Sequence, residues 1–338
     1  MAPAGAYWDR LQTMPKLGRF SAIHQPAHKI TRRRTISTAA VYSGLYAFTT
    51  WTFTNGNSTG RLGPNVSYLR SLYNTIGNTW IDNDIYFTVV GGIQYWTVPA
   101  TGTYTITSAG AVGGGNIGLG AQLTSTVSLT QGEVIRIAVG QRGANTNAFY
   151  GSGGGGTFVI RSPFNSNASI IQIAGGGGGK NSSGNTINAG GNASVTPGSV
   201  DNSGKATGGG GGGSSATSGG LNGAVGGNQT TGGYPGGGGG FFGNGGGSGG
   251  NTLIGGSSWT FGANGGMGFG SESVGGFGGG GGGSARGAGG GGYNGGNAGL
   301  NTASAGGGGS YNTGTNMSNV ANVNLGHGYV TVTFISSI

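Results

Sequence analysis

Short runs in which apolar and polar residues alternate occupy the first half of the chain, and they predict β-strands. The runs are rich in β-branched and aromatic residues and are separated by turn residues. They span residues 48–54, 85–90, 93–98, 104–108, 124–129, 134–139, 157–161 and 169–173. Residues 67–76 differ, because leucines three residues apart predict a helix there, with Asn65 or Ser67 as its N-cap.

The end of the chain returns to the strand pattern. Residues 329–335 (YVTVTFI) alternate cleanly and predict a strand. A β-sandwich that begins near residue 45 and takes its last strand from here encloses everything between as an insertion. The ends of that insertion are then held together, which lowers the entropic cost of ordering it.

The enclosed region is dominated by glycine. Most of the chain's 88 glycines follow residue 150, in pure runs such as 208–213 and 278–283. Glycine has no side chain to bury and loses the most backbone entropy on folding, so such a region is either disordered or packs backbone against backbone. A flexible Gly/Ser linker is one interpretation. Runs of this length also suit three-residue-per-turn helices that contact neighbours through N–H···O and Cα–H···O bonds, without the collagen register.

Aromatic residues recur through the glycine tract, which is unusual for a linker. They could pack on the ends and flanks of a glycine-helix bundle, or mark a binding surface. Our candidates for surface recognition are Tyr234, Phe241, Phe242, Trp259 and Tyr293.

Charge is concentrated at the N-terminus. The net charge is +9, and residues 1–34 carry seven basic residues against Asp9 alone. Such an arm suits an acidic partner, whether nucleic acid, a membrane surface or a protein groove, although a solvated tail has the same composition. Interspersed apolar residues favour docking onto a partner protein, with nucleic acid second. The predicted anchoring residues are Trp8, Arg10, Lys16, Arg19, Lys29, Arg32, Arg33 and Arg34.

Groups for catalysis are scarce. The chain has six carboxylates, three histidines and no cysteine. Asp82 and Asp84 are the one close acidic pair, and a solvated loop suits them better than a calcium or glycosidase site. A P-loop pattern at residues 174–181 fails because Ala174 and Asn181 replace the required Gly and Ser/Thr. We therefore predict no catalytic, metal or cofactor site, no enzyme activity and no sequence-specific nucleic-acid binding.

Targeting signals are also not apparent. The first residues lack the charged start and apolar stretch of a signal peptide, and no run approaches a membrane span. We expect a soluble protein outside the secretory pathway.

Several segments resemble a known family. Residues 93–106 (IQYWTVPATGTYTI), residues 109–111 with the glycine run after them, and then 137–143, 153–159 with 171–179, 275–298 and 326–330 follow in the same order. Together they resemble the glycine-rich domain of the anaplastic lymphoma kinase and leukocyte tyrosine kinase receptors, over roughly residues 45–335. The resemblance implies a tumour-necrosis-factor-like (TNF-like) β-sandwich interrupted by a bundle of glycine helices. The receptors' cysteines, membrane span and kinase region have no counterpart here, so neither the receptor role nor cytokine binding carries over.

A viral setting fits the same segments better. Residues 53–56 and 60–64, ahead of the 93–106 segment, also resemble modules in glycine-rich proteins of large DNA viruses and phages, which are short and free of cysteine. The resemblance to a TNF-like sandwich further implies a homotrimer.

These observations give one overall expectation. The fold is mostly β: an arm at residues 1–40, a TNF-like jelly-roll sandwich at 41–174 and 320–338, and a polyglycine-II helical insertion at 175–319. The expected function is a virion structural protein on the particle surface, such as a minor capsid, vertex or fibre component. Its arm would bind capsid or other virion proteins, and the displayed module would attach to a host surface glycan or protein. The alternative is a non-viral adhesin or binding module for carbohydrate or protein.

Overall fold

The structure is a computed structural model of the whole chain. It describes residues 44–73, 78–144, 151–183, 186–188, 193–194, 199–200, 206–207, 235–247, 254–268, 273–284, 286–299 and 305–338. The chain divides into two units, Met1–Val41 and Tyr42–Ile338, and all described residues belong to the second. The predicted anchoring arm, with its eight named residues, lies outside the described residues.

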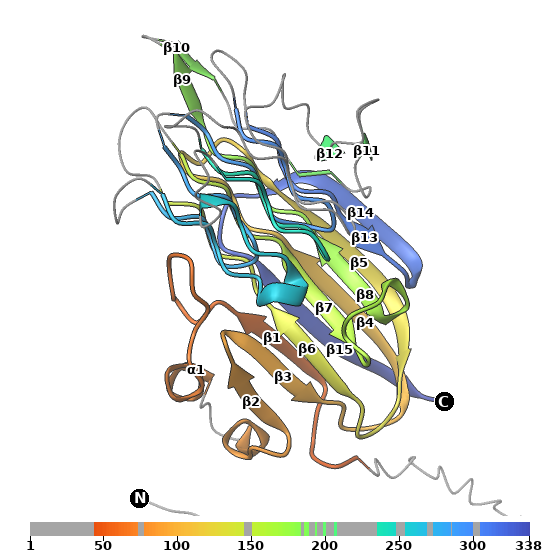
Figure 1. The fold of residues 1–338 in the computed structure, drawn as a ribbon. Helices are drawn as coiled ribbons and strands as arrows, with labels where there is room; N and C mark the ends of the chain where they lie inside the picture. Colours follow the sequence, from red (N-terminus) through yellow and green to blue (C-terminus); the bar gives the residue numbers. More distant parts are fainter. Residues whose placement is uncertain are drawn as a thin grey trace, which may run out of the picture. The chain divides into compact units, whose positions relative to one another are not determined.

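Two antiparallel sheets pack face to face as a β-sandwich, which confirms the mostly β prediction (Figure 1). The five-stranded sheet has the order β1–β15–β4–β5–β14, and the six-stranded sheet has the order β13–β8–β7–β6–β3–β2. The first contains β1 (Thr50–Thr54), β4 (Gly102–Ala109), β5 (Gly120–Leu129), β14 (Thr315–Asn324) and β15 (Tyr329–Ser337). The second contains β2 (Phe87–Val90), β3 (Ile93–Thr97), β6 (Val134–Ala138), β7 (Thr157–Arg161), β8 (Ile170–Ala174) and β13 (Tyr311–Asn312).

Smaller elements complete the described chain. Two short strand pairs lie within the glycine-rich region, β9 (Asn181–Ser183) with β10 (Thr186–Asn188) and β11 (Ser199–Val200) with β12 (Ala206–Thr207). The helices are α1 (Val66–Tyr73) and the 3₁₀ turns η1 (Thr79–Asp82), η2 (Asn167–Ser169) and η4 (Trp259–Phe261). Within the described residues, no helix combines the length and apolarity that crossing a membrane requires.

Helix α1 was predicted from its leucine spacing, and it forms. The Asn65 side chain accepts the Tyr68 backbone N–H at 2.8 Å, which identifies Asn65 as the N-cap. Leu69 and Tyr73 are buried on its inner side. Residues 74–76, the last part of the predicted helix, lie outside the described residues.

Alternation along the strands builds the core. In β4 every second residue from Gly102 to Ser108 is buried, so one face of the strand points into the sandwich. Large aromatic side chains fill the space between the sheets, among them Phe53, Phe87, Trp96 and Tyr104, each fully buried. The predicted strands are therefore present, with ends that shift by a few residues.

The closing strand β15 lies between β1 and β4, in the interior of the five-stranded sheet. Its register pairs Val330 with Phe53 on one side and with Ser108 on the other. The sandwich therefore needs both ends of the described chain, and the glycine-rich residues between β8 and β13 leave and re-enter it.

Strand β14 was not predicted. Its sequence, TNMSNVANVN, is rich in asparagine and lacks apolar alternation. It forms because it pairs with β5, with Ser318 opposite Thr124, and irregularities in the register bend it along its length. The sandwich therefore resumes at β13 and β14, earlier than the expected residue 320.

Two buried glutamines hydrogen-bond one sheet to the other. Gln172 of β8 donates from Nε2 to Ile106 O (3.0 Å) and Ser125 Oγ (2.8 Å), and accepts from the Ser108 hydroxyl (2.8 Å). Gln94 of β3 donates to Thr54 O at 2.8 Å. Because these four bonds cross to the opposite sheet, the two amides fix how the sheets face each other.

Candidate functional site: the glycine segments and the flank of the sandwich

Residues 287–293 are the centre of the packed glycine region. The backbone N–H groups of residues 288–293 donate in turn to three neighbouring segments, and the same three recur every third residue. The bonds, of 2.8–3.1 Å, run from Ala288 to Gly151, Gly289 to Gly236, Gly290 to Gly306, Gly291 to Gly154, Gly292 to Gly239 and Tyr293 to Gly309. A repeat of three residues with no internal hydrogen bonds distinguishes this segment from an α-helix and from a β-strand.

The carbonyl groups of the same segment accept bonds from three further directions. Gly289 O accepts from Gly281 N–H at 2.8 Å, Gly290 O from Gly296 N–H at 2.7 Å, and Gly291 O from Gly176 N–H at 2.8 Å. The segment is thus hydrogen-bonded to backbone on six sides. Its buried polar groups are satisfied without side chains, as a buried backbone requires.

Space explains why these positions are glycine. A Cβ atom added at Gly289, Gly290 or Gly291 would clash with a backbone carbonyl oxygen, because the distance would be shorter than the distances that real Cβ atoms show. The oxygens belong to Gly296, Gly176 and Gly278, respectively. The obstructing atoms are backbone atoms, so they cannot move aside as a flexible side chain can. Any side chain here must therefore push whole segments apart.

The packed segments continue directly from sandwich strands. Gly110–Gly115 follows β4, Gly153–Gly156 precedes β7, and Gly175–Gly179 follows β8. Gly177 N–H donates to Ala111 O, and Gly154 N–H donates to Gly177 O. The Thr157 hydroxyl joins the two regions, because it donates to Ala109 O (2.6 Å) and accepts from Gly140 N–H (3.0 Å). The glycine segments are therefore ordered by the same strands that form the sandwich.

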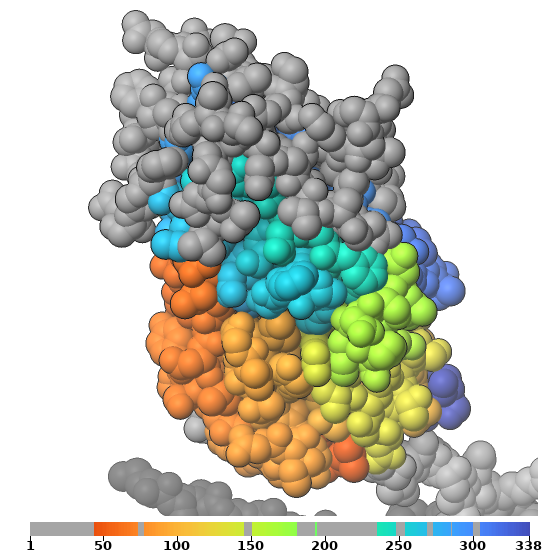
Figure 2. Space-filling model, in the orientation of Figure 1, coloured from red at the N-terminus to blue at the C-terminus, as the bar shows by residue number. Residues whose placement is uncertain are grey.

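Three of the five aromatic residues proposed for surface recognition are buried. The exposed fractions are 0% for Phe241, 5% for Trp259 and 6% for Tyr293. They join a core on the outer side of the six-stranded sheet, where Trp259 stacks on Phe158 at 5.5 Å. In Figure 2 the cyan residues of this region lie against the orange and yellow-green surface of the sandwich.

Because these three residues are buried, their role is in packing and not in the surface recognition that we expected. The physical reason is that the sheet face under them is apolar, with Phe158 and Ile160 pointing outward, and needs a cover. Trp259 also donates from Nε1 to Phe164 O at 2.7 Å. Phe242 is half-buried and packs against Phe241, and Tyr234 lies outside the described residues.

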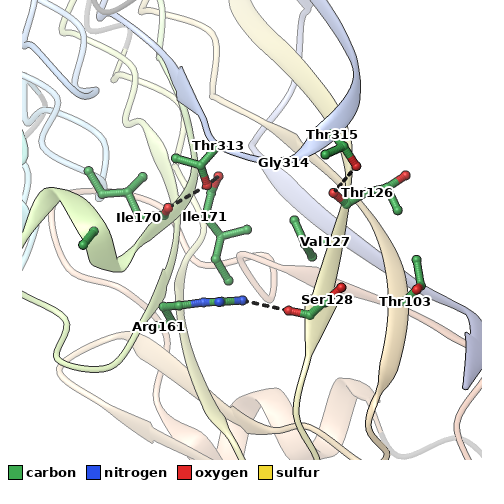
Figure 3. A pocket seen from close by; sticks show the side chains of 11 residues that line it. Thr103, Thr126, Val127, Ser128, Arg161, Ile170, Ile171, Thr313, Gly314 and Thr315 are labelled. Atoms are coloured by element: carbon green, nitrogen blue, oxygen red, sulfur yellow. Dashed lines mark hydrogen bonds between the residues drawn. The ribbon is translucent and has the colours of Figure 1, made fainter. Parts of the chain in front are cut away.

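A cavity of about 440 Å³ opens at the flank of the sandwich (Figure 3). It lies between β5 of one sheet and the ends of β7 and β8 of the other, beside the connection from β13 to β14. The lining residues are Thr103, Thr126, Val127, Ser128, Arg161, Ala168, Ile170, Ile171, Thr313, Gly314 and Thr315. Most are small hydroxyl-bearing or aliphatic residues, so the cavity suits a small molecule with both polar and apolar faces.

Arg161 spans the cavity, but it is already engaged. Its Nη2 donates to Ser128 O at 3.1 Å, and its Nε lies 3.3 Å from Glu133 Oε1. The hydroxyls of Thr313 and Thr315 donate to the backbone carbonyls of Ile170 and Thr126. Arg161 is the only ionisable side chain among these described lining residues, so the cavity holds no acid–base pair.

A second groove, of about 390 Å³, lies between β1 and α1 and includes Trp51, Leu72 and Tyr73. The Tyr73 hydroxyl accepts Thr54 N–H at 2.6 Å and contacts Gln94 Oε1 at 3.0 Å. Burial raises the pKa of Tyr73, so the hydroxyl stays protonated and can act as a donor at neutral pH. Sequence reasoning missed this network and that of Gln172, although a glutamine within the apolar run IIQIA was a signal of a buried polar link.

Of the remaining ionisable candidates, Asp84 and His327 have structural partners. Asp84 forms an ion pair with Arg70 (2.7 Å) and is 81% exposed, and Asp82 is also exposed. His327 lies between β14 and β15, where its Nδ1 accepts Arg142 N–H at 3.2 Å. Burial, and then the nearby Arg142 charge, lower the pKa of His327. Across the part of the chain that the structure describes, no three His, Asp or Glu side chains are placed to hold a metal ion.

Comparison with protein-family models and with curated proteins gives no match for this chain.

Proposed function

We propose that this chain is a structural protein of a virus particle, which it joins through residues 1–40 and on whose surface it displays the sandwich and glycine segments. The observation that carries the proposal is the three-residue hydrogen-bond repeat of residues 288–293. A region built from backbone packed on backbone forms a rigid spacer with few side chains for chemistry. Such a region therefore suits a structural or display role better than a catalytic role.

The finer fold belongs to the same proposal. The glycine segments are polyglycine-II helices in a six-neighbour bundle, supported by the alternation of donors among three segments. The sandwich is a TNF-like jelly roll, supported by the last strand β15 lying next to the first strand β1. Both agree with the resemblance to the glycine-rich modules of receptors and large DNA viruses.

The basic arm supplies the anchor. Residues 1–34 hold +6 of the net charge of +9, and apolar residues such as Trp8 and Phe20 accompany that charge. An arm of this kind suits a protein groove on the particle with an acidic rim. Within the five-stranded sheet, by contrast, no strand carries a charged residue.

A second candidate function is a carbohydrate- or protein-binding adhesin that belongs to no particle. The observation that favours it is the hydroxyl-lined cavity beside Arg161, which is large enough for a single sugar ring. On a particle the same cavity would serve host attachment, so the two candidates differ in the arm and not in the body.

Deletion of residues 1–40 tests the anchor. We expect the truncated protein to keep the melting temperature of the full chain but to be missing from purified particles. A matched pair of variants tests whether the positive charge of the arm is what matters. In one variant lysine replaces Arg32, Arg33 and Arg34, and this protein should be incorporated into particles. In the other alanine replaces the same three residues, and this protein should be depleted from particles. Truncated protein that reaches the particle at the normal level contradicts the anchoring role of residues 1–40, whereas a full chain that is missing from purified particles leaves the adhesin.

A further inference from the structure

The outward face of the five-stranded sheet carries threonine and serine in rows that cross all five strands. The strand register aligns two complete rows, and these ten residues are here named the threonine face. The rows are Thr52, Thr331, Thr107, Thr124 and Ser318, and Thr50, Thr333, Thr105, Thr126 and Thr315. All ten are exposed or half-buried in a single copy.

Hydroxyl groups of the threonine face bond one another. The Oγ1 atoms of Thr50 and Thr333 are 2.9 Å apart, those of Thr52 and Thr331 are also 2.9 Å apart, and those of Thr107 and Thr124 are 3.0 Å apart. A hydroxyl already paired within the protein loses little when water is removed, whereas a free one costs free energy to bury. The six hydroxyls of these pairs therefore need fewer new hydrogen-bond partners, when they are covered, than free hydroxyls would.

The face also lacks charge. None of the five strands contains Lys, Arg, Asp or Glu, whereas a typical soluble surface is about 25–35% charged. The six-stranded sheet, by comparison, carries Arg136 and Arg161. Uncharged β-branched residues on a pleated surface suit packing against another sheet.

We propose that the threonine face is a homotypic interface on which a second copy of this chain packs, face to face, about a two-fold axis. The threonine face forms the middle of the outward face of the five-stranded sheet. With strands about 4.8 Å apart and mostly about 25 Å long, that outward face has a footprint of roughly 600 Å². A pair of faces then buries about 1,200 Å², the lower end of the range for specific interfaces. A charged partner would meet no complementary charge here, while an identical face matches in size and neutrality.

A two-fold pair has a consequence for assembly. A face that meets an identical face about a two-fold axis gives a closed, isologous dimer. This differs from the homotrimer that the family resemblance predicts. The inference does not depend on the virion proposal, because it concerns the purified chain.

Sedimentation of the purified full chain, with Thr105→Lys as the test variant, decides between these outcomes. Thr105 lies on the central strand of the face, so the two-fold axis brings two buried like charges together. We expect a wild-type dimer of twice 32.8 kDa at micromolar concentration. The association constant of the Thr105→Lys protein should fall at least ~100-fold.

Thr88→Lys is the matched control, since Thr88 is a half-buried position on β2 of the other sheet. It should sediment as the wild type does. A wild-type monomer or trimer, or a folded Thr105→Lys protein that stays dimeric, would overturn the inference. If Thr105→Lys does not fold by circular dichroism, Thr333→Lys at the neighbouring position is read in the same way.

Discussion

At the residue scale, the protein depends on a few side chains whose partners are backbone atoms. Tyr73, Gln172 and His327 each hydrogen-bond a main-chain group of another element. In a chain with few charges, these bonds hold segments in register where ion pairs are scarce. Each can be removed with little change in volume.

Replacing Tyr73 by phenylalanine should lower the free energy of unfolding by about 1–3 kcal/mol. The change removes the acceptor of Thr54 N–H and the contact with Gln94 while keeping the ring. Urea denaturation of both proteins measures the difference. Tyr68→Phe, at an exposed position of the same helix, is the control and should change stability by less than about 0.5 kcal/mol.

His327 should make stability depend on pH. Its folded-state pKa lies below the ordinary value of 6.5, so as the pH falls below that value the unfolded chain binds a proton that the folded chain does not. Stability therefore falls on acidification and is fully present above about pH 6.5. Melting temperatures between neutral and mildly acidic pH should show this decline.

The His327→Asn variant tests that assignment, because an amide oxygen can accept Arg142 N–H but does not titrate. Its melting temperature should vary less with pH than that of the wild type over the same interval. Equal pH dependence in the two proteins would assign the effect to other groups.

At the element scale, strands were predictable wherever one face of the strand is buried. Alternation marks β4 and β15 because their inward residues fill the core. It could not mark β14, whose residues are mostly polar and whose place depends on pairing with β5. The aromatic residues of the glycine tract show the same limit. Phe241 lies between Gly240 and Phe242, and Trp259 lies between Ser258 and Thr260, so neither shows an alternating pattern. Only the tertiary structure shows the apolar sheet face that they cover.

The link between the two sheets is also set at this scale. Gln172→Leu keeps the volume but leaves Ile106 O and the hydroxyls of Ser108 and Ser125 without this partner. We expect a loss of about 2–3 kcal/mol, because buried polar groups without partners are costly. Chemical denaturation measures it, with the exposed Gln131→Leu as control. A loss as small as that of the control would mean that the sheets are aligned by apolar packing alone.

At the scale of the whole molecule, the sandwich and the glycine segments form one continuously hydrogen-bonded structure in the described residues. Strands β4, β7 and β8 run directly into or out of glycine segments, and residues 287–293 hydrogen-bond to segments from both halves of the chain. From the sequence we expected the glycine tract to be a packed scaffold, with a flexible linker as the other interpretation. In the described residues the backbone hydrogen bonds show a packed scaffold, because each glycine segment bonds to segments that are far away in sequence.

Replacing Gly290 by alanine, with the free energy of unfolding as the readout, tests this packing most directly. The added Cβ would meet the carbonyl oxygen of Gly176, so the stability of a packed scaffold should fall by about 3 kcal/mol or more. The matched control is Gly326→Ala, where the nearest atom is Asn324 Oδ1 at 3.6 Å, and its stability should stay within about 0.5 kcal/mol of the wild type. If Gly290→Ala is as stable as Gly326→Ala, the glycine segments do not pack backbone against backbone.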